Sequence, residues 1–456
     1  MAERNKVIAI FDIGKTNKKI FLWNEDYQIV FERQENFEEI LDDEGFLGED
    51  IQAVQVWVKQ TFSEVCALPE FEVKALNFSA YGATVVFVDS QGASVGPLYN
   101  YLKPFPEDLF PYSNYGGQAE FARATASPIL GNLNSGLQAF RVMKTQAEKW
   151  KDIAWVLHWP NFLASLFTNE LGTEITSIGC HTALWDFDSQ QYHAWVQDSG
   201  LLEKLPKILP VQTRFYSQDR PNAIPVGLGL HDSSSALVPY LKAIDSDFVL
   251  VSTGTWCISM HPFSQQALTA VELENDVLCF MQFNGNPVKA ARLFAGNTHE
   301  IQLKRMNAHF NAEPKAYQQF QFSPAYVARL DEALAQNPSL AEAHADFINI
   351  CRFDARDLNE FTSLEEAYVQ LMVDIMCQQI YSLQLLLHNA PVGKIVVDGG
   401  FSKNPLYMNF LVHAFPGVAI FGAEVAQASS LGAALVMHEA WNSKQIPSDL
   451  VKIKKF

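Results

Sequence analysis

A short polar turn near the start of the chain has the residue types that bind a phosphate. It lies between two apolar stretches and reads Asp12-Ile13-Gly14-Lys15-Thr16-Asn17. Gly14 lets backbone N–H groups approach an anion closely, while Thr16 and Asn17 add donors. Lys15 adds a positive charge. We therefore predict a β-hairpin whose tip binds nucleotide phosphates, with a plain Asp/Gly hairpin turn as the alternative.

Asp12 is a carboxylate beside this predicted phosphate site. Two negative groups repel each other unless a metal ion lies between them. A carboxylate that holds Mg²⁺, mostly through water, is common in phosphoryl transfer. We therefore predict Asp12 as a Mg²⁺ ligand.

A second turn of the same kind follows an apolar run about halfway along the chain. It reads Ser252-Thr253-Gly254-Thr255 and is again followed by apolar residues. Two such hairpins, each opening one half of the chain, indicate two domains built on one plan. Three more Gly- or Ser-rich motifs accompany the hairpins: Gly227 to Ala236, Asp398 to Pro405 and Ala426 to Ala434.

In their order and spacing, these five motifs resemble the FGGY family of carbohydrate kinases, which have the hexokinase, actin and Hsp70 superfold. The resemblance runs from Ile8 to Ala434. It implies an α/β fold of two ribonuclease-H-like (actin-like ATPase) domains with an interdomain cleft. Residues 1–243 would hold the sugar site and the first phosphate hairpin. Residues 244–456 would hold the second hairpin and the adenosine site.

The resemblance also implies an activity, a cofactor and roles for single residues. The activity is ATP-dependent phosphorylation of a small sugar with Mg²⁺, and Asp232 is the catalytic base. The predicted phosphate contacts are Gly14, Lys15, Thr16, Asn17, Gly254 and Thr255, and the predicted adenosine contacts are Gly399, Gly400 and Asn404.

Asp232 has two interpretations. An Asp followed by three serines is also a good helix N-cap, because its carboxylate accepts hydrogen bonds from first-turn N–H groups. A sugar kinase, however, needs one carboxylate to take the proton of the substrate hydroxyl. Both roles are compatible, because a carboxylate at a helix N-terminus stays ionised near neutral pH.

The predicted sugar contacts are Asp232 itself and Tyr81, Asn161, His181 and His231. Three of these residues have a structural alternative: Tyr81 as a turn aromatic, Asn161 as a helix cap and His181 as a core histidine. The pair of His231 and Asp232 resembles the rhamnulokinase and fuculokinase branch of the family.

The chain departs from the family pattern in two places. Many members carry Trp-x-Asp-x-Arg where this chain has Leu98 to Phe105, which puts a xylulose- or glycerol-type site in doubt. Lys15 also stands where Thr or Ser is usual. An aromatic site would suit a deoxy-ketose such as L-rhamnulose or L-fuculose, with Tyr99, Tyr101 and Phe105 as an apolar wall for its methyl group.

Composition agrees with a two-domain enzyme. The 456 residues are 48% hydrophobic and 18% charged, enough for two domains with sizeable cores. The net charge of −18 argues against nucleic acid or an anionic membrane as the main partner. We interpret the acidic stretch Glu35 to Asp50, and the basic residues Lys452, Lys454 and Lys455, as solvated surface.

Cellular location and partners are predicted from what the sequence lacks. The six cysteines form no CxxC pair, and no apolar span reaches membrane length. No signal-peptide pattern precedes the first hairpin. We therefore expect a cytoplasmic protein that binds a sugar and ATP. A homodimer is suggested by analogy alone.

Strands and helices must position these motifs. We predict three short strands within Val7–Gln34, strands at Val73–Phe78, Val85–Val88 and Lys394–Val397, and helices at Ile51–Val65, Trp159–Thr168 and Ser233–Lys242. A long core helix should begin at Ser363 with a capping box to Glu366 and end near His388.

Two other functions are compatible with this fold. One is a catalytically inactive regulator that binds sugar or nucleotide, and the other is an ATPase acting on protein partners. Asp12 and Asp232 argue against the first. The Asp232 motif and the lack of a peptide-binding segment argue against the second.

Overall fold

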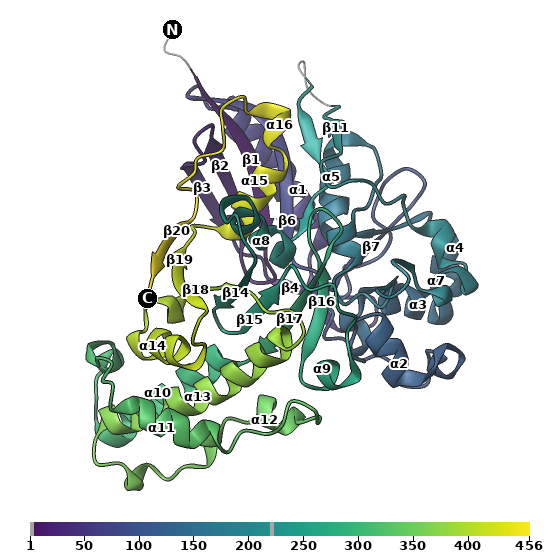
Figure 1. Cartoon of the computed structure of the whole chain (residues 1–456). Coiled ribbons are helices and arrows are strands. Elements are labelled where there is room, and N and C mark those ends of the chain that lie inside the picture. The colour runs from purple at the N-terminus through teal and green to yellow at the C-terminus, as the bar shows by residue number, and fades with distance from the viewer. Residues whose placement is uncertain (1–3, 219–222) are drawn as a thin grey trace. The chain divides into compact units, whose positions relative to one another are not determined.

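The computed structural model describes residues 4–218 and 223–456, and Figure 1 shows their helices and strands. The chain divides into two compact units. The first contains Met1–Ala243, Cys279–Asn286 and Ala426–Leu450, and the second contains Ile244–Leu278, Pro287–Val425 and Val451–Phe456. The predicted division at residues 243/244 differs from this one, because two later segments are grouped with the first unit.

The first unit is built on a mixed sheet with the strand order β11-β12-β6-β1-β2-β3, and β13 also pairs with β6. β1 is parallel to β6 and antiparallel to β2, so the first predicted hairpin is present. The strands are β1 (Asn5–Ile13), β2 (Lys18–Asn24), β3 (Ile29–Glu35), β6 (Phe71–Ala80), β11 (Arg214–Tyr216), β12 (Pro225–Gly227) and β13 (Leu230–His231).

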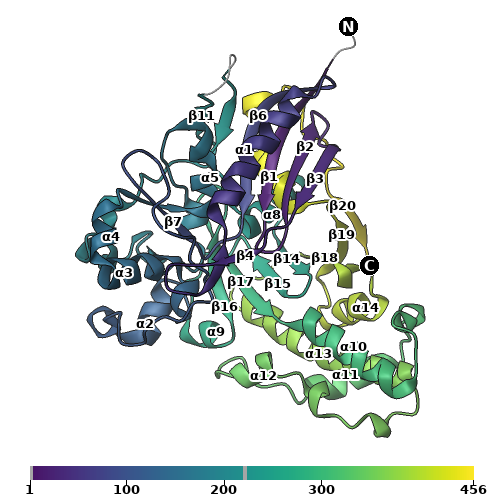
Figure 2. The same ribbon diagram turned by 180° about the vertical axis from the view of Figure 1, so that it is seen from behind.

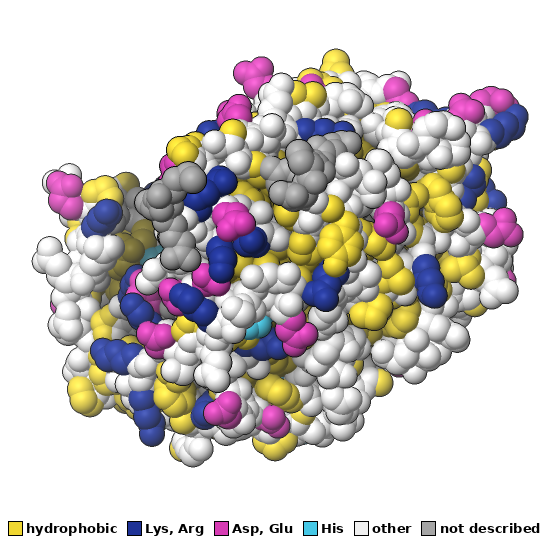
Figure 3. Space-filling model, turned by 90° about the horizontal axis from the view of Figure 1, so that it is seen from above, with side chains coloured by type: hydrophobic (Ala, Val, Ile, Leu, Met, Phe, Trp, Pro, Cys, Tyr) yellow, Lys and Arg dark blue, Asp and Glu magenta, His cyan; other side chains and the backbone are white. Residues whose placement is uncertain are grey.

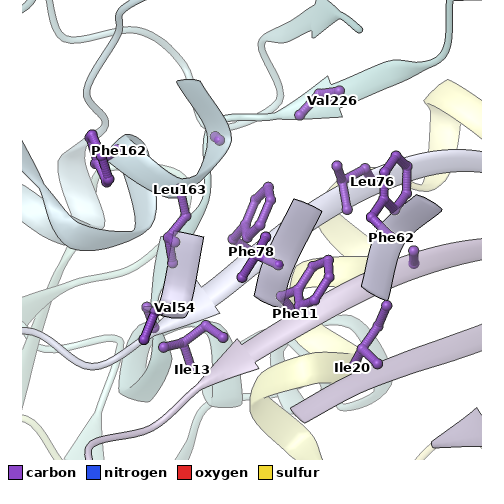
Figure 4. Close-up of a cluster of buried hydrophobic side chains, with 14 of the residues drawn as sticks. Phe11, Ile13, Ile20, Val54, Phe62, Leu76, Phe78, Phe162, Leu163 and Val226 are labelled. Atoms are coloured by element: carbon purple, nitrogen blue, oxygen red, sulfur yellow. The ribbon is translucent and has the colours of Figure 1, made fainter. Parts of the chain in front are cut away.

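Helices cover both faces of this sheet. α8 (Asp232–Ala243) and α15 (Ala428–Val436) lie in front of it in Figure 1, and α1 (Ile51–Ala67) lies in front of it when seen from behind in Figure 2. Phe11 of β1 points to the α1 side, where it stacks on Phe78 with ring centroids 5.6 Å apart (Figure 4). Alternation along the strand then turns Asp12 to the α15 side.

A second apolar cluster of the first unit lies around a strand pair outside the main sheet. β7 (Val85–Val88) pairs with β8 (Trp155–His158), which leads into α5 (Trp159–Thr168). The predicted helix and strand positions here are confirmed. The short helices α2 (Gly117–Ala124), α3 (Ser135–Thr145), α4 (Ala147–Asp152), α6 (Ile175–Ile178) and α7 (Ala194–Asp198) complete this region.

The acidic stretch Glu35–Asp50 is largely exposed, as predicted, but it is more ordered than a solvated loop. It folds into the two-stranded pair β4 (Glu39–Leu41) and β5 (Leu47–Glu49). Glu49 is only 5% exposed, and the Asp42 carboxylate accepts a hydrogen bond from Lys103. Burial is possible because each carboxylate faces a basic side chain, which the charge pattern of the stretch alone does not show.

The second unit repeats the same plan. Its sheet contains the order β17-β15-β14-β18-β19-β20. β14 and β15 form the second predicted hairpin, and β14 is parallel to β18. The strands are β14 (Phe248–Thr253), β15 (Cys257–His261), β17 (Pro287–Leu293), β18 (Lys394–Gly399), β19 (Ala419–Glu424) and β20 (Lys452–Lys455); β16 (Val277–Met281) lies where the chain leaves this unit.

The long core helix of the second unit is α13 (Leu364–Leu387), which packs against β15 and β17. Ser363 caps it as predicted, accepting from the N–H of Glu366 at 3.2 Å. The capping box is wrong in one detail, because the Glu366 carboxylate accepts from the N–H of Thr362 instead of Ser363. The other helices are α9 (Ala270–Glu274), α10 (Ala295–Phe310), α11 (Tyr326–Leu334), α12 (Ala345–Asn349) and α14 (Pro405–Ala414); α16 (His438–Trp441) belongs to the first unit.

Charged residues are dispersed over the face seen in Figure 3, where acidic and basic side chains alternate. The basic residues near the C-terminus are exposed, as predicted, but they form the edge strand β20, antiparallel to β19. Within residues 4–218 and 223–456, no helix has both the length and the apolar character to span a membrane.

Candidate active site

Three neighbouring parallel strands end together in the first unit and bring its predicted site residues to one edge. The register pairs Asp12 of β1 with Ser79 of β6, and His231 of β13 with Ala80. Tyr81 and Asp232 therefore follow directly on adjacent strands. Tyr81 is tied to the first hairpin, since its N–H donates to the carbonyl of Ile13 at 3.1 Å.

Asp12 lies at the end of β1, just before the tight turn of the first hairpin. The Gly14 N–H donates to the Asn17 carbonyl at 2.9 Å and closes that turn. The Asp12 Oδ2 accepts from Ser429 Oγ of α15 at 2.8 Å. Burial, and to a lesser degree the charge of Asp232, raise the pKa of Asp12 to about 6. The surroundings of Asp12 therefore disfavour the ionised form of its carboxylate.

Lys15 points to carboxylates in this structure. Its Nζ lies 2.6 Å from Glu39 Oε1 and 3.5 Å from Glu49 Oε1. The neighbouring Lys18 is buried and also pairs with Glu49, at 3.1 Å. The phosphate contact of Lys15 stays a prediction, and it would require Lys15 to leave Glu39.

Asp232 is the first residue of α8 and is not a regular N-cap. Its Oδ1 accepts from the Ser233 N–H at 2.6 Å and from the Ser233 hydroxyl at 3.2 Å. His231 Nε2 lies 3.3 Å from the same oxygen. One third of the Asp232 side chain is exposed, yet desolvation by the surrounding protein raises its pKa to about 6. A carboxylate with these properties is ionised at neutral pH and basic enough to accept a proton.

The loop before Asp232 is held by residues far from it in sequence. Asn161 Nδ2 donates to the Leu228 carbonyl at 2.9 Å, and Thr173 Oγ1 donates to Asn161 Oδ1 at 2.9 Å. Gly229 has φ +79°, and a Cβ there would overlap Pro160. The Asn161 side chain therefore positions this loop instead of capping α5. The proposed function includes no sugar contact by Asn161.

The other predicted sugar residues differ in their surroundings. Tyr81 is buried, and its ring centroid is 6.3 Å from that of Tyr101. Burial and the charge of Glu49 raise the pKa of Tyr81 well above its usual value. His181 is half-buried with a left-handed φ of 37°, and its ring meets Phe280 edge-on at 6.3 Å.

In the second unit, all the predicted nucleotide residues except Gly399 line a common cavity of about 490 Å³. The register pairs Thr253 of β14 with Gly399 of β18, so the second turn and the Gly399–Gly400 turn meet at one sheet edge. Gly399 itself has φ +87°, and a Cβ there would overlap the Thr253 carbonyl. Gly254, Thr255, Gly400 and Asn404 all line the cavity, together with Gly296, His299, Tyr317, Tyr368 and Phe401.

Asn404 is largely occupied by the protein. Its Oδ1 accepts from the N–H of Leu406 at 3.0 Å and caps α14, and its Nδ2 donates to the Tyr368 hydroxyl at 2.7 Å. The His299 ring lies 5.7 Å from Tyr368 and 5.3 Å from Tyr317, between centroids. These aromatic rings provide flat apolar surface of the kind that a nucleobase packs against.

Sequence reasoning missed several residues of both sites. Ser429 lies in a motif that we noted without giving it a role. Gly296 follows β17, and a Cβ there would overlap the Gly254 carbonyl, so the second turn rests on this glycine. The lone glycine between Ala295 and Asn297 was the only local signal. The aromatic residues of the cavity come from three separate segments, and no local sequence pattern indicated them.

The residues of the first unit fit a Mg²⁺ ion that is shared with phosphate. Burial raises the pKa values of both the Asp12 and the Asp232 carboxylates, and a bound cation would stabilise their ionised forms. Among residues 4–218 and 223–456, no cluster of three or more His, Cys, Asp or Glu could hold a metal by itself. Mg²⁺ suits such a sparse site, because it keeps several waters and is usually bound with substrate phosphates.

Comparison with known families gives a match over part of the chain. Residues 245–445 match the C-terminal domain of the carbohydrate kinase family FGGY. A search of curated proteins gave no significant match.

Solved structures match almost the whole chain. A carbohydrate kinase from Novosphingobium aromaticivorans has 20% identity and a TM-score of 0.79, covering 99% of this chain and 94% of that one. Xylulose kinase from Lactobacillus acidophilus has 15% identity and a TM-score of 0.76, covering 99% and 93%. Glycerol kinase from Plasmodium falciparum, solved with ADP, has 16% identity and a TM-score of 0.72, covering 98% and 91%.

The family match covers residues 245–445, and the fold of the chain is similar to that of solved carbohydrate kinases. The predicted two-domain α/β fold is confirmed. The similar structures include kinases with different named substrates, so they indicate no single sugar for this chain. The rhamnulokinase and fuculokinase branch stays a prediction.

Proposed function

We propose that this protein transfers the γ-phosphoryl group of Mg·ATP to a hydroxyl of a small sugar, with Asp232 as the general base. The observation that carries the proposal is the state of the Asp232 carboxylate. Its Oδ1 is held by Ser233, its side chain is partly exposed, and its pKa is about 6. A structural cap needs none of this basicity, whereas a base that activates a hydroxyl does.

The proposed reaction needs residues from both units. The sugar hydroxyl gives its proton to Asp232 as its oxygen forms a bond to the γ-phosphorus. The bond from that phosphorus to the β–γ bridging oxygen breaks, and its electron pair leaves with ADP. Asp12 would hold Mg²⁺ through water, and Mg²⁺ neutralises phosphate charge when bound. In the second turn, the Gly254 N–H already donates to the Trp256 carbonyl at 2.9 Å, so the Thr255 N–H would be the donor to the phosphates.

We further propose a ketose or deoxy-ketose, such as L-rhamnulose or L-fuculose, as the substrate. Of the three predicted wall residues, Tyr101 lies against Tyr81 and suits this role. Tyr99 does not, because it is 1% exposed and its ring is covered by the cations of Lys103 and Arg141. Phe105 is partly buried in the second apolar cluster. The proposed apolar wall therefore consists of Tyr101 and the neighbouring Tyr81.

A panel assay tests the activity and the base together. ADP release with Mg·ATP is measured across ketoses, deoxy-ketoses and polyols, for the native protein and for Asp232→Asn. We expect one preferred sugar and a loss of about 10²-fold or more in kcat for the variant, with ATP affinity unchanged. Background turnover with every sugar, by a protein that binds ATP, would instead favour the alternative of an inactive regulator.

A further inference from the structure

The ring of His299 is held in one orientation on the wall of the cavity in the second unit. His299 lies near the start of α10 and is 9% exposed. Its ring meets three aromatic rings edge-on, with centroids 5.3 Å from Tyr317, 5.7 Å from Tyr368 and 5.2 Å from Phe401. These contacts come from three separate segments and leave the ring little room to turn.

A chain of hydrogen bonds begins at the N-cap of α14 and ends at this ring. Asn404 Oδ1 accepts from the N–H groups of Leu406 at 3.0 Å and Tyr407 at 3.3 Å. The amide is thereby oriented, and its Nδ2 donates to the Tyr368 hydroxyl at 2.7 Å. The same hydroxyl lies 3.1 Å from His299 Nε2. The start of α14 is therefore connected to the imidazole through two side chains.

The Tyr368 hydroxyl has a single proton to donate. Its oxygen accepts from Asn404, whose amide nitrogen cannot accept in return. Tyr368 is 1% exposed, and among the residues that the structure describes its hydroxyl has no hydrogen-bond partner besides Asn404 and His299. Because a buried hydroxyl proton without an acceptor is costly, the hydroxyl donates to His299 Nε2.

The other nitrogen of the imidazole therefore carries a proton. A ring nitrogen that accepts a hydrogen bond has none, so the proton of the neutral ring is on Nδ1. A charged ring would have a proton on Nδ1 as well. No hydrogen bond reaches Nδ1 from any residue in the described part of the chain, and the atom is not buried. Since His299 lines the cavity, its Nδ1–H is available to a ligand there.

An aromatic cavity with an available N–H donor fits a flat ring that carries an acceptor atom. Adenine has such acceptors in the plane of its ring, at N1, N3 and N7. We propose that His299 is a specificity-determining residue whose Nδ1–H donates to a ring nitrogen of the nucleobase, and that Tyr368 and Asn404 position this donor; the inference rests on the proposed function. Asn404 would then act on the nucleobase through Tyr368.

Analogues of ATP that lack one ring nitrogen test the contact. The deaza analogues at N1, N3 and N7 each replace a nitrogen with C–H, and calorimetric titration measures their affinity. We expect at least one analogue to bind native protein about fivefold or more weakly than ATP, because the donor loses its acceptor. In His299→Phe, which keeps a ring at this position, the same analogue should bind within about twofold of ATP. Equal binding of all four nucleotides to native protein, or an unchanged difference in the variant, would overturn the proposal.

Two further variants separate the donor from general damage to the cavity. His309 is exposed on the same helix, about 15 Å along its axis from His299. His309→Phe should bind every nucleotide as native protein does, and loss of the difference there would count against His299. Tyr368→Phe leaves either nitrogen of His299 to carry the proton, so the difference between ATP and the analogue should fall about twofold or more. An unchanged difference in this variant, shown by thermal unfolding to be folded, would contradict the positioning role.

A measurement without nucleotide tests the position of the proton. Ring-¹⁵N histidine NMR of the native protein, with His299 assigned by its disappearance in His299→Phe, reports which nitrogen is protonated. A proton on Nδ1 supports the proposal, and a proton on Nε2 alone contradicts it. Native protein that has the proton on Nδ1 and binds ATP in preference to the analogue, yet turns over no sugar, would overturn the proposed kinase activity and leave the role of His299 intact.

Discussion

At the scale of single residues, the candidate site depends on two carboxylates whose environments differ. Asp12 is tied to Ser429 of α15, and Asp232 is held on one oxygen by Ser233. Both have pKa values raised to about 6 by burial. Their types and order in the chain led to their prediction as site residues, and their roles stay predictions. The partner Ser429 was not predictable, because nothing local relates it to Asp12.

In the proposed reaction, the pKa of Asp232 determines the acid side of the pH profile. Only the ionised carboxylate accepts a proton, so kcat/KM for Mg·ATP should be level above about pH 7 and fall tenfold per unit below about pH 6. A carboxylate with the ordinary pKa of 3.8 would give no fall until about pH 4. Initial rates from pH 4.5 to 8, at low Mg·ATP and with a stability control at each pH, distinguish the raised pKa from the ordinary one. A profile that stays level down to pH 4.5 contradicts the raised pKa.

At the scale of elements, most of the scaffold could be predicted. Both hairpins, α1, α5 and the long helix α13 follow from apolar periodicity and from turn or cap residues. The burial of the Glu49 and Asp42 side chains could not, because it depends on Lys18 and Lys103 from other segments. Local sequence patterns predict local structure. They do not show that a charged side chain is buried when its partner lies far away in the sequence.

The second phosphate turn rests on the first residues of α10. A Cβ at Gly296 would overlap the Gly254 carbonyl, so Gly296→Ala must displace the turn or the helix. We expect ATP affinity to fall about tenfold, and the free energy of unfolding to fall by about 1–3 kcal/mol, as overpacking does.

A matched control exists in the same unit. Among the residues that the structure describes, none has an atom within 4 Å of the position that an added methyl group at Gly393 would occupy. Gly393→Ala should therefore leave ATP affinity and stability unchanged. Calorimetric titration with ATP and thermal unfolding of both variants provide the comparison. Unchanged ATP binding by Gly296→Ala would show that the turn does not contact the nucleotide.

At the scale of the whole molecule, the first unit is assembled from segments that lie far apart in the sequence. α15 packs on α8 so closely that a Cβ at Gly432 would overlap the Ser235 carbonyl. Trp23 Nε1 donates to Ser430 Oγ at 2.9 Å, and Asn77 Nδ2 donates to the Ala433 carbonyl at 2.9 Å. A division of the chain at one point therefore does not describe its units.

Removal of α15 should damage the unit that it joins. A chain that ends after Val425 would lose α15, which together with α8 covers one face of the β1–β6 sheet, and we expect it to be insoluble or to lose cooperative unfolding. A chain that lacks only Lys452–Phe456 loses the edge strand β20 of the second unit and should keep the first unit intact. Solubility and far- and near-ultraviolet circular dichroism compare the two. A well-folded 1–425 chain would contradict the packing described.

The bond between Ser429 and Asp12 also has a consequence for synthesis on the ribosome. The two residues are 417 positions apart, so β1 emerges long before the helix that covers Asp12. At roughly 5–20 residues per second, tens of seconds separate the completion of α8 from that of α15. During this interval the Asp12 carboxylate lacks its serine partner. The Asp12–Ser429 hydrogen bond therefore forms only after α15 has been made.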